Sequence, residues 1–72
     1  MHPSIGRIVH YQSYGTPGGE YLPEPRAAVI AAVGDDGSTC DLVVFNPTGL
    51  FFNRCSFSEE PKPGHWRWPP RL

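Results

Sequence analysis

The sequence predicts an all-β domain: a small antiparallel barrel of four to five short strands with one long Gly/Pro-rich loop. Nine Pro and eight Gly among 72 residues favour short strands joined by turns over long helices. The apolar residues fall in short runs that are separated by turn residues. Strands of this number and length are typical of an SH3-like or an OB-like barrel.

The length and charge of the chain limit what it can bind. Its 72 residues make one domain, residues 1–72, with a thin core, because so small a domain buries only about 60% of its unfolded surface. Pairing with a second copy relieves that limit, so we expect a homo-oligomer. The formal net charge is −1, and the six basic residues are spread along the chain, which disfavours a nucleic-acid partner.

Neither a membrane span nor a signal peptide is visible. No apolar run approaches the roughly 18 residues that a span requires, and Met1-His2-Pro3 leads directly into a mixed segment. We therefore expect a cytoplasmic protein with no membrane partner.

The first strand candidate covers residues 4–12 and is rich in β-branched and aromatic residues. Arg7 falls on the same face as Val9 and Tyr11, so that face should be only half buried. Residues 13–25 then form the long loop, with three Pro and three Gly. A loop of this length in a small domain is a candidate for contact with a ligand or partner.

Residues 26–33, RAAVIAAV, have alanines that favour a helix and β-branched residues that favour a strand. Pro25 before them and Gly34-Asp35-Asp36-Gly37 after them leave eight residues, which is normal for a strand and short for a helix. We predict a strand that enters a hairpin with residues 39–46. The alanines mark a place where another element packs closely.

The densest apolar segment, residues 40–57, predicts a second hairpin around the type I turn Asn46-Pro47-Thr48-Gly49, with Gly49 free to take a positive φ. A two-residue connection places Cys40 opposite Cys55, whereas a bulge at Gly49 places Cys40 opposite Ser56. A disulfide or half of a metal site is one interpretation of the cysteines. Two small buried thiols in a reducing compartment is the other, and we prefer it.

The last strand candidate is His65–Trp68, in which Trp66 and Trp68 share a face. The sequence predicts no cofactor and no enzyme. His2, His10 and His65 are the only general-base candidates near neutral pH, and no Ser, Thr or Cys is spaced to form a nucleophilic site with one of them.

Amphipathic aromatic residues, with a few Arg and Asn side chains, offer what a nucleobase or peptide pocket requires. The alternative is that the tryptophans only cap the core. The predicted ligand-binding residues are Tyr11, Tyr14, Arg26, Asn53, Arg54, His65 and Trp66.

The segments IGRIVHY, SYGTPGGEY, RAAVI, NPTGLFFN and PGHWRWPPR together resemble a family of small hypothetical proteins of actinobacterial phages and prophages. The resemblance covers nearly the whole chain and implies phage origin and action inside a bacterial cell or a virion. Where that family often has Thr and His in its final strand, this chain has His65 and Arg67. No role for that histidine is therefore carried over.

These observations lead to three functional hypotheses. The first is a phage-encoded accessory protein without enzymatic activity: a host-takeover or anti-defence factor that sequesters a nucleotide-type signal or blocks a host protein. The second is a minor structural or adaptor protein of the virion, pairing through its sheet edges. The third is a barrel that binds nucleic acid weakly, against which the neutral charge weighs.

Overall fold

The computed structural model describes residues 2–15, 24–46 and 49–70, and within them the chain forms five β-strands and no helix. Consequently, no helix in these ranges is long and apolar enough to cross a membrane. The all-β prediction is confirmed, and so is the strand predicted for residues 26–33. The strands are β1 (Ile8–Gln12), β2 (Pro25–Val33), β3 (Cys40–Asn46), β4 (Gly49–Cys55) and β5 (Trp66–Arg67).

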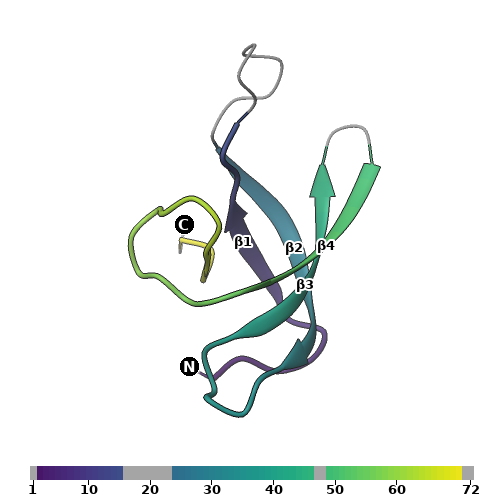
Figure 1. Ribbon diagram of the computed structural model, residues 1–72, viewed down its shortest axis with the longest axis vertical. Coiled ribbons are helices and arrows are strands. Elements are labelled where there is room, and N and C mark those ends of the chain that lie inside the picture. The colour runs from purple at the N-terminus through teal and green to yellow at the C-terminus, as the bar shows by residue number, and fades with distance from the viewer. Residues whose placement is uncertain (1, 16–23, 47–48, 71–72) are drawn as a thin grey trace.

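The strands form one antiparallel sheet in the order β4-β3-β2-β1-β5 (Figure 1). Four strands follow one another as a meander and the fifth returns to the first. An OB barrel follows a Greek-key path instead, so this strand order differs from the OB-like alternative.

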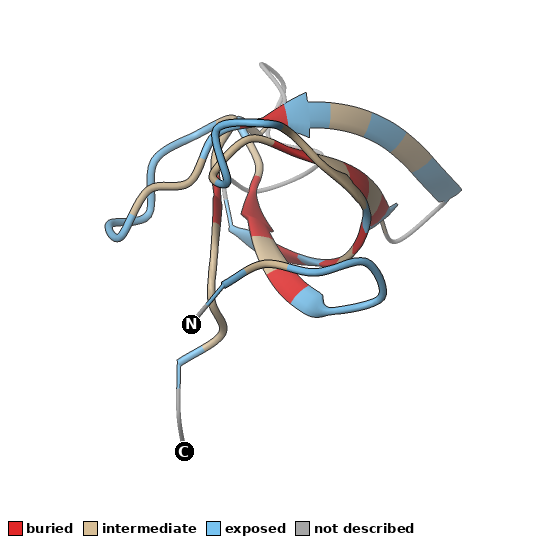
Figure 2. Cartoon of the chain, turned by 90° about the horizontal axis from the view of Figure 1, so that it is seen from below, coloured by how far each residue is buried: buried red, intermediate tan, exposed pale blue. Residues whose placement is uncertain are grey.

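The segment after β4 closes the barrel against β5. The Trp66 amide donates to the Ser56 carbonyl (3.1 Å), and the Ser58 amide donates to the Trp66 carbonyl (2.9 Å). Between them, Phe57 and Trp66 form a parallel bridge. Figure 2 shows the strands curled around a common interior, with the first half of β4 projecting away from it.

Alternate residues of each strand point into the barrel, as the twofold period of a strand requires. The inward face of β1 is fully buried, with Val9 at 0% and Tyr11 at 3% exposure, so the expectation of half burial was wrong. The reason is that β1 begins at Ile8, which leaves Arg7 exposed outside the strand. The apolar core consists of Val9, Tyr11, Ala28, Ile30, Cys40, Leu42, Val44, Cys55 and Trp66.

The alanines of β2 lie on both faces of the sheet. Ala28 is fully buried between Val9 of β1 and Val44 of β3, where its small side chain lets the neighbouring strands pack. Ala27 and Ala31 are exposed on the outside.

Asp36 organises the turn between β2 and β3, at the position of the predicted hairpin. Its Oδ1 accepts hydrogen bonds from the amides of Ser38 (3.0 Å) and Thr39 (2.8 Å), and its Oδ2 accepts one from the Thr39 hydroxyl (2.7 Å). These bonds favour the carboxylate, so they lower the pKa of Asp36 to about 2. Gly37 takes a φ of +75°, which a glycine adopts without strain.

We expect Asp36→Ala to destabilise the domain at pH 7, because three donors lose their acceptor. The pKa of Asp36 is lower in the folded than in the unfolded chain. Its contribution is therefore full above the unfolded pKa near 4 and is lost as the pH falls towards about 2. Urea unfolding at pH 7 and pH 2.5 measures this. The difference in the free energy of unfolding between wild type and Asp36→Ala should be smaller at pH 2.5 than at pH 7. Asp35→Ala should change the free energy of unfolding little at either pH. An equal difference at both pH values would contradict the assignment.

The β3–β4 hairpin has the register of a two-residue connection. Asn46 pairs with Gly49 and Cys40 with Cys55, so the alternative with Ser56 is excluded. Gly49 does not take a positive φ and starts β4 as an ordinary strand residue. The type I turn itself, at residues 47–48, lies outside the described residues, as does most of the predicted long loop, residues 16–23.

Candidate functional site

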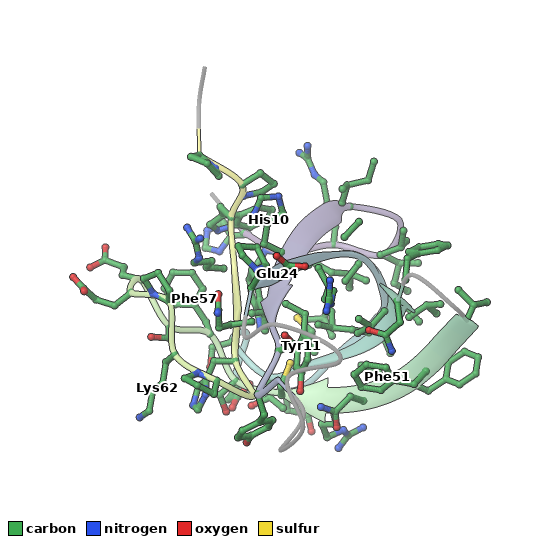
Figure 3. The ribbon with its side chains drawn as sticks, turned by 90° about the horizontal axis from the view of Figure 1, so that it is seen from above. His10, Tyr11, Glu24, Phe51, Phe57 and Lys62 are labelled. Carbon is green, nitrogen blue, oxygen red and sulfur yellow. The ribbon has the colours of Figure 1, made fainter. Side chains whose placement is uncertain are left out.

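Three of the seven predicted ligand-binding residues meet at the end of the barrel where β1 stops. Asn53 Nδ2 donates to the Tyr11 hydroxyl (3.2 Å), and Tyr11 lies opposite Arg26 across β1 and β2. The Arg26 guanidinium donates to Glu24 Oε1 (2.6 Å). Phe51, which was not among the predicted residues, packs edge to face against Tyr11, with the two ring centroids 5.5 Å apart. Figure 3 shows this end of the barrel, with Tyr11 and Glu24 near its middle and Phe51 towards β4.

This cluster is closed rather than open. Tyr11 is 3% and Arg26 8% exposed, and burial raises the pKa of the Tyr11 hydroxyl. An aromatic ring in this position serves first as core, with its hydroxyl satisfied by Asn53. The period of β4, which places Phe51 and Asn53 on one face, was the sequence signal that could have added Phe51.

Tyr14 and His65 lie on two neighbouring segments of the chain near β5. Tyr14 is 70% exposed, and its hydroxyl sits so close to Gly64 that it leaves no room for a side chain there; Gly64 also has a φ of +80°. His65 Nδ1 lies 3.0 Å from the Pro63 carbonyl, to which the Nδ1–H tautomer donates.

Trp66 is 1% exposed and belongs to the core. Its Nε1 donates to the Ser38 carbonyl (2.8 Å), and its ring contacts Phe57 at 5.0 Å and Trp68 at 5.3 Å. The contact between the two tryptophans fits the prediction that they share a face. A pocket of about 140 Å³ adjoins them, which is small beside the roughly 300–1,000 Å³ of typical ligand sites. Its lining is His2, Pro3, Gly37, Ser38, Phe57, Trp66 and Trp68.

Arg54 is exposed on the outside of β4 and forms a two-point ion pair with Asp41 of β3. Its Nε and Nη2 donate to the two carboxylate oxygens at 2.7 and 3.1 Å. These hydrogen bonds lower the pKa of Asp41. Beside the pair is a groove of about 330 Å³, lined by Ala31, Asp41, Leu42, Phe52, Asn53 and Arg54.

The groove borders a larger feature that the sequence did not predict. This feature is a set of apolar side chains on the outer surface of the sheet. Residues paired across an antiparallel sheet lie on one face. The strand register therefore aligns two rows on the outside of the barrel. The first row is Ile8, Val29, Val43 and Phe52, and the second is Ala27, Phe45 and Leu50. We call these seven residues the outer apolar face.

Four large side chains of the outer apolar face are open to solvent. Ile8 is 65%, Phe45 46%, Leu50 56% and Phe52 75% exposed. Together they leave on the order of 400 Å² of apolar surface uncovered, a size at which a surface patch is often functional. Its rim carries the Asp41–Arg54 pair, which is internally neutral.

His10 extends the second row on β1, opposite Arg67 of β5. Burial, and then the positive charge of Arg67, lowers the pKa of His10, so its ring is neutral at pH 7. On this side the outer apolar face therefore ends at the neutral His10 ring, with the guanidinium of Arg67 beyond it.

The two cysteines are buried, free and opposite each other in the hairpin. This agrees with the interpretation of two packing thiols. Burial, followed by the neighbouring Cys40, raises the pKa of Cys55 to about 11, and burial raises that of Cys40 as well. Within the described ranges, no group of three or more His, Cys, Asp or Glu side chains is placed to hold a metal ion.

We expect both thiols to resist alkylation by iodoacetamide at pH 8 in the folded protein, because the reactive thiolate is scarce and shielded. Mass spectrometry should show labelling only in denaturant. Rapid labelling of either cysteine in the native protein would contradict the structure. Because folding raises these pKa values, their contribution to stability is present below about pH 9 and lost as the pH rises towards 11.

Comparison of the chain with models of protein families, with curated proteins and with solved structures gave no match.

Proposed function

We propose that this chain is a binding protein without an enzymatic step of its own, which blocks a bacterial host protein by covering it with the outer apolar face. The observation that carries the proposal is the alignment of Ile8, Phe45, Leu50 and Phe52 on the outside of the sheet. The resemblance to phage proteins supports the choice of a bacterial protein as partner.

The chemistry of the face indicates what it accepts. Asp41 and Arg54 at its rim neutralise each other, Arg67 lies beyond His10 on the β5 side, and its centre is apolar. Charged groups on a partner would lose hydration there without gaining a counter-charge. The partner surface should therefore be apolar at its centre and polar at its rim, as protein interfaces commonly are.

The proposal assigns no catalytic role to the histidines. Across the described ranges, no histidine ring is hydrogen-bonded to a hydroxyl or thiol, which a nucleophilic site requires. His10 lies beside Arg67, and His65 lies against the Pro63 carbonyl.

The test is affinity capture from a bacterial host lysate, followed by calorimetry with the purified partner. Phe45→Asp should weaken binding at least about tenfold, since it places an unpaired charge in the interface. Ile5→Asp is the control, because Ile5 is 73% exposed but lies outside the two rows. Equal affinities for wild type and Phe45→Asp would refute the proposal.

A second candidate function is sequestration of a nucleotide-type ligand at the end of the barrel. The cluster of Tyr11, Arg26, Phe51 and Asn53 supplies the chemistry, because it combines aromatic rings with a guanidinium and an amide, and binding requires this closed cluster to open. Calorimetry with cyclic dinucleotides and ADP-ribose derivatives tests this candidate. Asn53→Ala should remove any binding, and no heat from wild type across the panel would eliminate it.

A further inference from the structure

The half of β4 that projects from the barrel has one side without a partner strand. β4 is the end strand of the sheet and pairs with β3 alone. The other end strand, β5, is covered, because Trp66 pairs with Tyr11 on one side and with Phe57 on the other. Among the described strands, β4 is thus the only one with an open edge (Figures 1 and 2).

This edge lacks the features with which proteins normally prevent strand pairing. Such features are a lysine, a proline, an inward-pointing charge or a bulge. From Gly49 to Asn53 the strand reads Gly-Leu-Phe-Phe-Asn, and its pairing with β3 is regular throughout. Its one charged residue, Arg54, points outwards and is already bonded to Asp41. An apolar, regular, open edge is a template for another strand.

We propose that the occupant is a second copy of this chain, whose β4 pairs antiparallel with β4 about a twofold axis at Phe52. This goes beyond the proposed function and does not require a host partner. The backbone direction fits this register. The Ser56 carbonyl and the Ser58 amide both point towards Trp66, away from β3. Since strand residues alternate, Leu50, Phe52 and Arg54 direct their backbone groups to the same open side.

The side chains are compatible with this register. On the outside, Phe52 meets Phe52 of the second copy, an aromatic cross-strand pair, and Leu50 lies beside the aliphatic part of Arg54. No like charges stand opposite each other. Because each copy has one open edge, the pairing closes as a dimer rather than continuing into a filament.

The dimer also completes the candidate site. It places the second copy's Leu50 next to the groove lined by Phe52 and Arg54, and it joins two outer apolar faces into one surface. The newly covered area is modest. Covering parts of Leu50 and Phe52 buries far less than the roughly 800 Å² per partner of a standard interface, which indicates a weak dimer.

Sedimentation velocity on the purified chain, from about 5 to 500 µM, tests the proposal. Wild type should shift from monomer to dimer across this range. Phe52→Lys should weaken dimerisation at least tenfold, while Ile5→Lys, at nearly the same exposure (73% against 75%), should leave it unchanged. Wild type that stays monomeric, or two variants with equal effects, would overturn the proposal.

Hydrogen exchange distinguishes edge pairing from contact between faces. The amides of Leu50, Phe52 and Arg54 should exchange more slowly as the concentration rises, while amides already bonded within the sheet stay unchanged. A dimer without this protection, weakened equally by Phe45→Lys and Phe52→Lys, would show packing of the two faces and refute the edge register.

Discussion

Replacing Trp66 with alanine should unfold the protein or leave it barely folded. The ring is 1% exposed and joins β1, the segment at Phe57 and the turn at Ser38. Loss of a buried Trp or Phe costs about 3–5 kcal/mol. A domain of this size has a total stability of roughly 4–11 kcal/mol, so the variant loses a large part of it. Chemical denaturation followed by circular dichroism measures the loss.

Two conservative variants separate the contributions of Trp66. Trp66→Phe keeps an aromatic ring near Phe57 but loses the Nε1–H donor to Ser38, and it should cost about 1–2 kcal/mol. Trp68→Ala removes a half-buried ring and should cost less than Trp66→Ala. Were Trp66→Ala to lower the free energy of unfolding by less than 1 kcal/mol, the assignment of Trp66 to the core would be wrong.

Leu42→Ala should have the next largest effect, about 2–5 kcal/mol. Leu42 is 1% exposed at the middle of β3, between Ile30 of β2 and Asn53 of β4. The structure leaves little room for collapse there, because β3 is hydrogen-bonded to both neighbouring strands, β2 and β4. Urea unfolding at pH 7 gives the change in the free energy of unfolding.

The matched control is Val43→Ala, one residue further along the same strand. Val43 belongs to the outer apolar face and is half buried, so its truncation should cost no more than about 1 kcal/mol. Together the two variants test which face of β3 is inside. Equal losses, or a larger loss for Val43, would reverse the assignment of the faces.

The sequence was sufficient to predict the strands and to limit the register of one hairpin to two alternatives. Alternation and turn residues identified each strand, whereas the connection at residues 46–49 left Cys40 opposite either Cys55 or Ser56, and the structure shows Cys55. Both signals are local. Turn geometry sets the register of a hairpin without reference to the rest of the chain.

The candidate site could not be predicted in the same way, because exposure depends on sheet curvature and strand order. Phe45, Leu50 and Phe52 look as apolar as the core residues between them. They are open to solvent because their side chains lie on the outside of β3 and β4. Conversely, Tyr11 and Trp66 were selected as ligand-binding residues because of their amphipathic rings. The structure places both inside the barrel, since they fall at inward positions of β1 and β5.

The proposal that the outer apolar face binds a host protein is tested most directly by photo-cross-linking in bacterial cells. A benzophenone amino acid is placed at position 45, on the face, or at position 62, on the far side of the barrel from Phe51 and β4 (Figure 3). We predict one major adduct between the chain and a host protein from position 45, and none from position 62. Adducts of equal yield from both positions, or from position 62 alone, would contradict the assignment of the outer apolar face as the binding site.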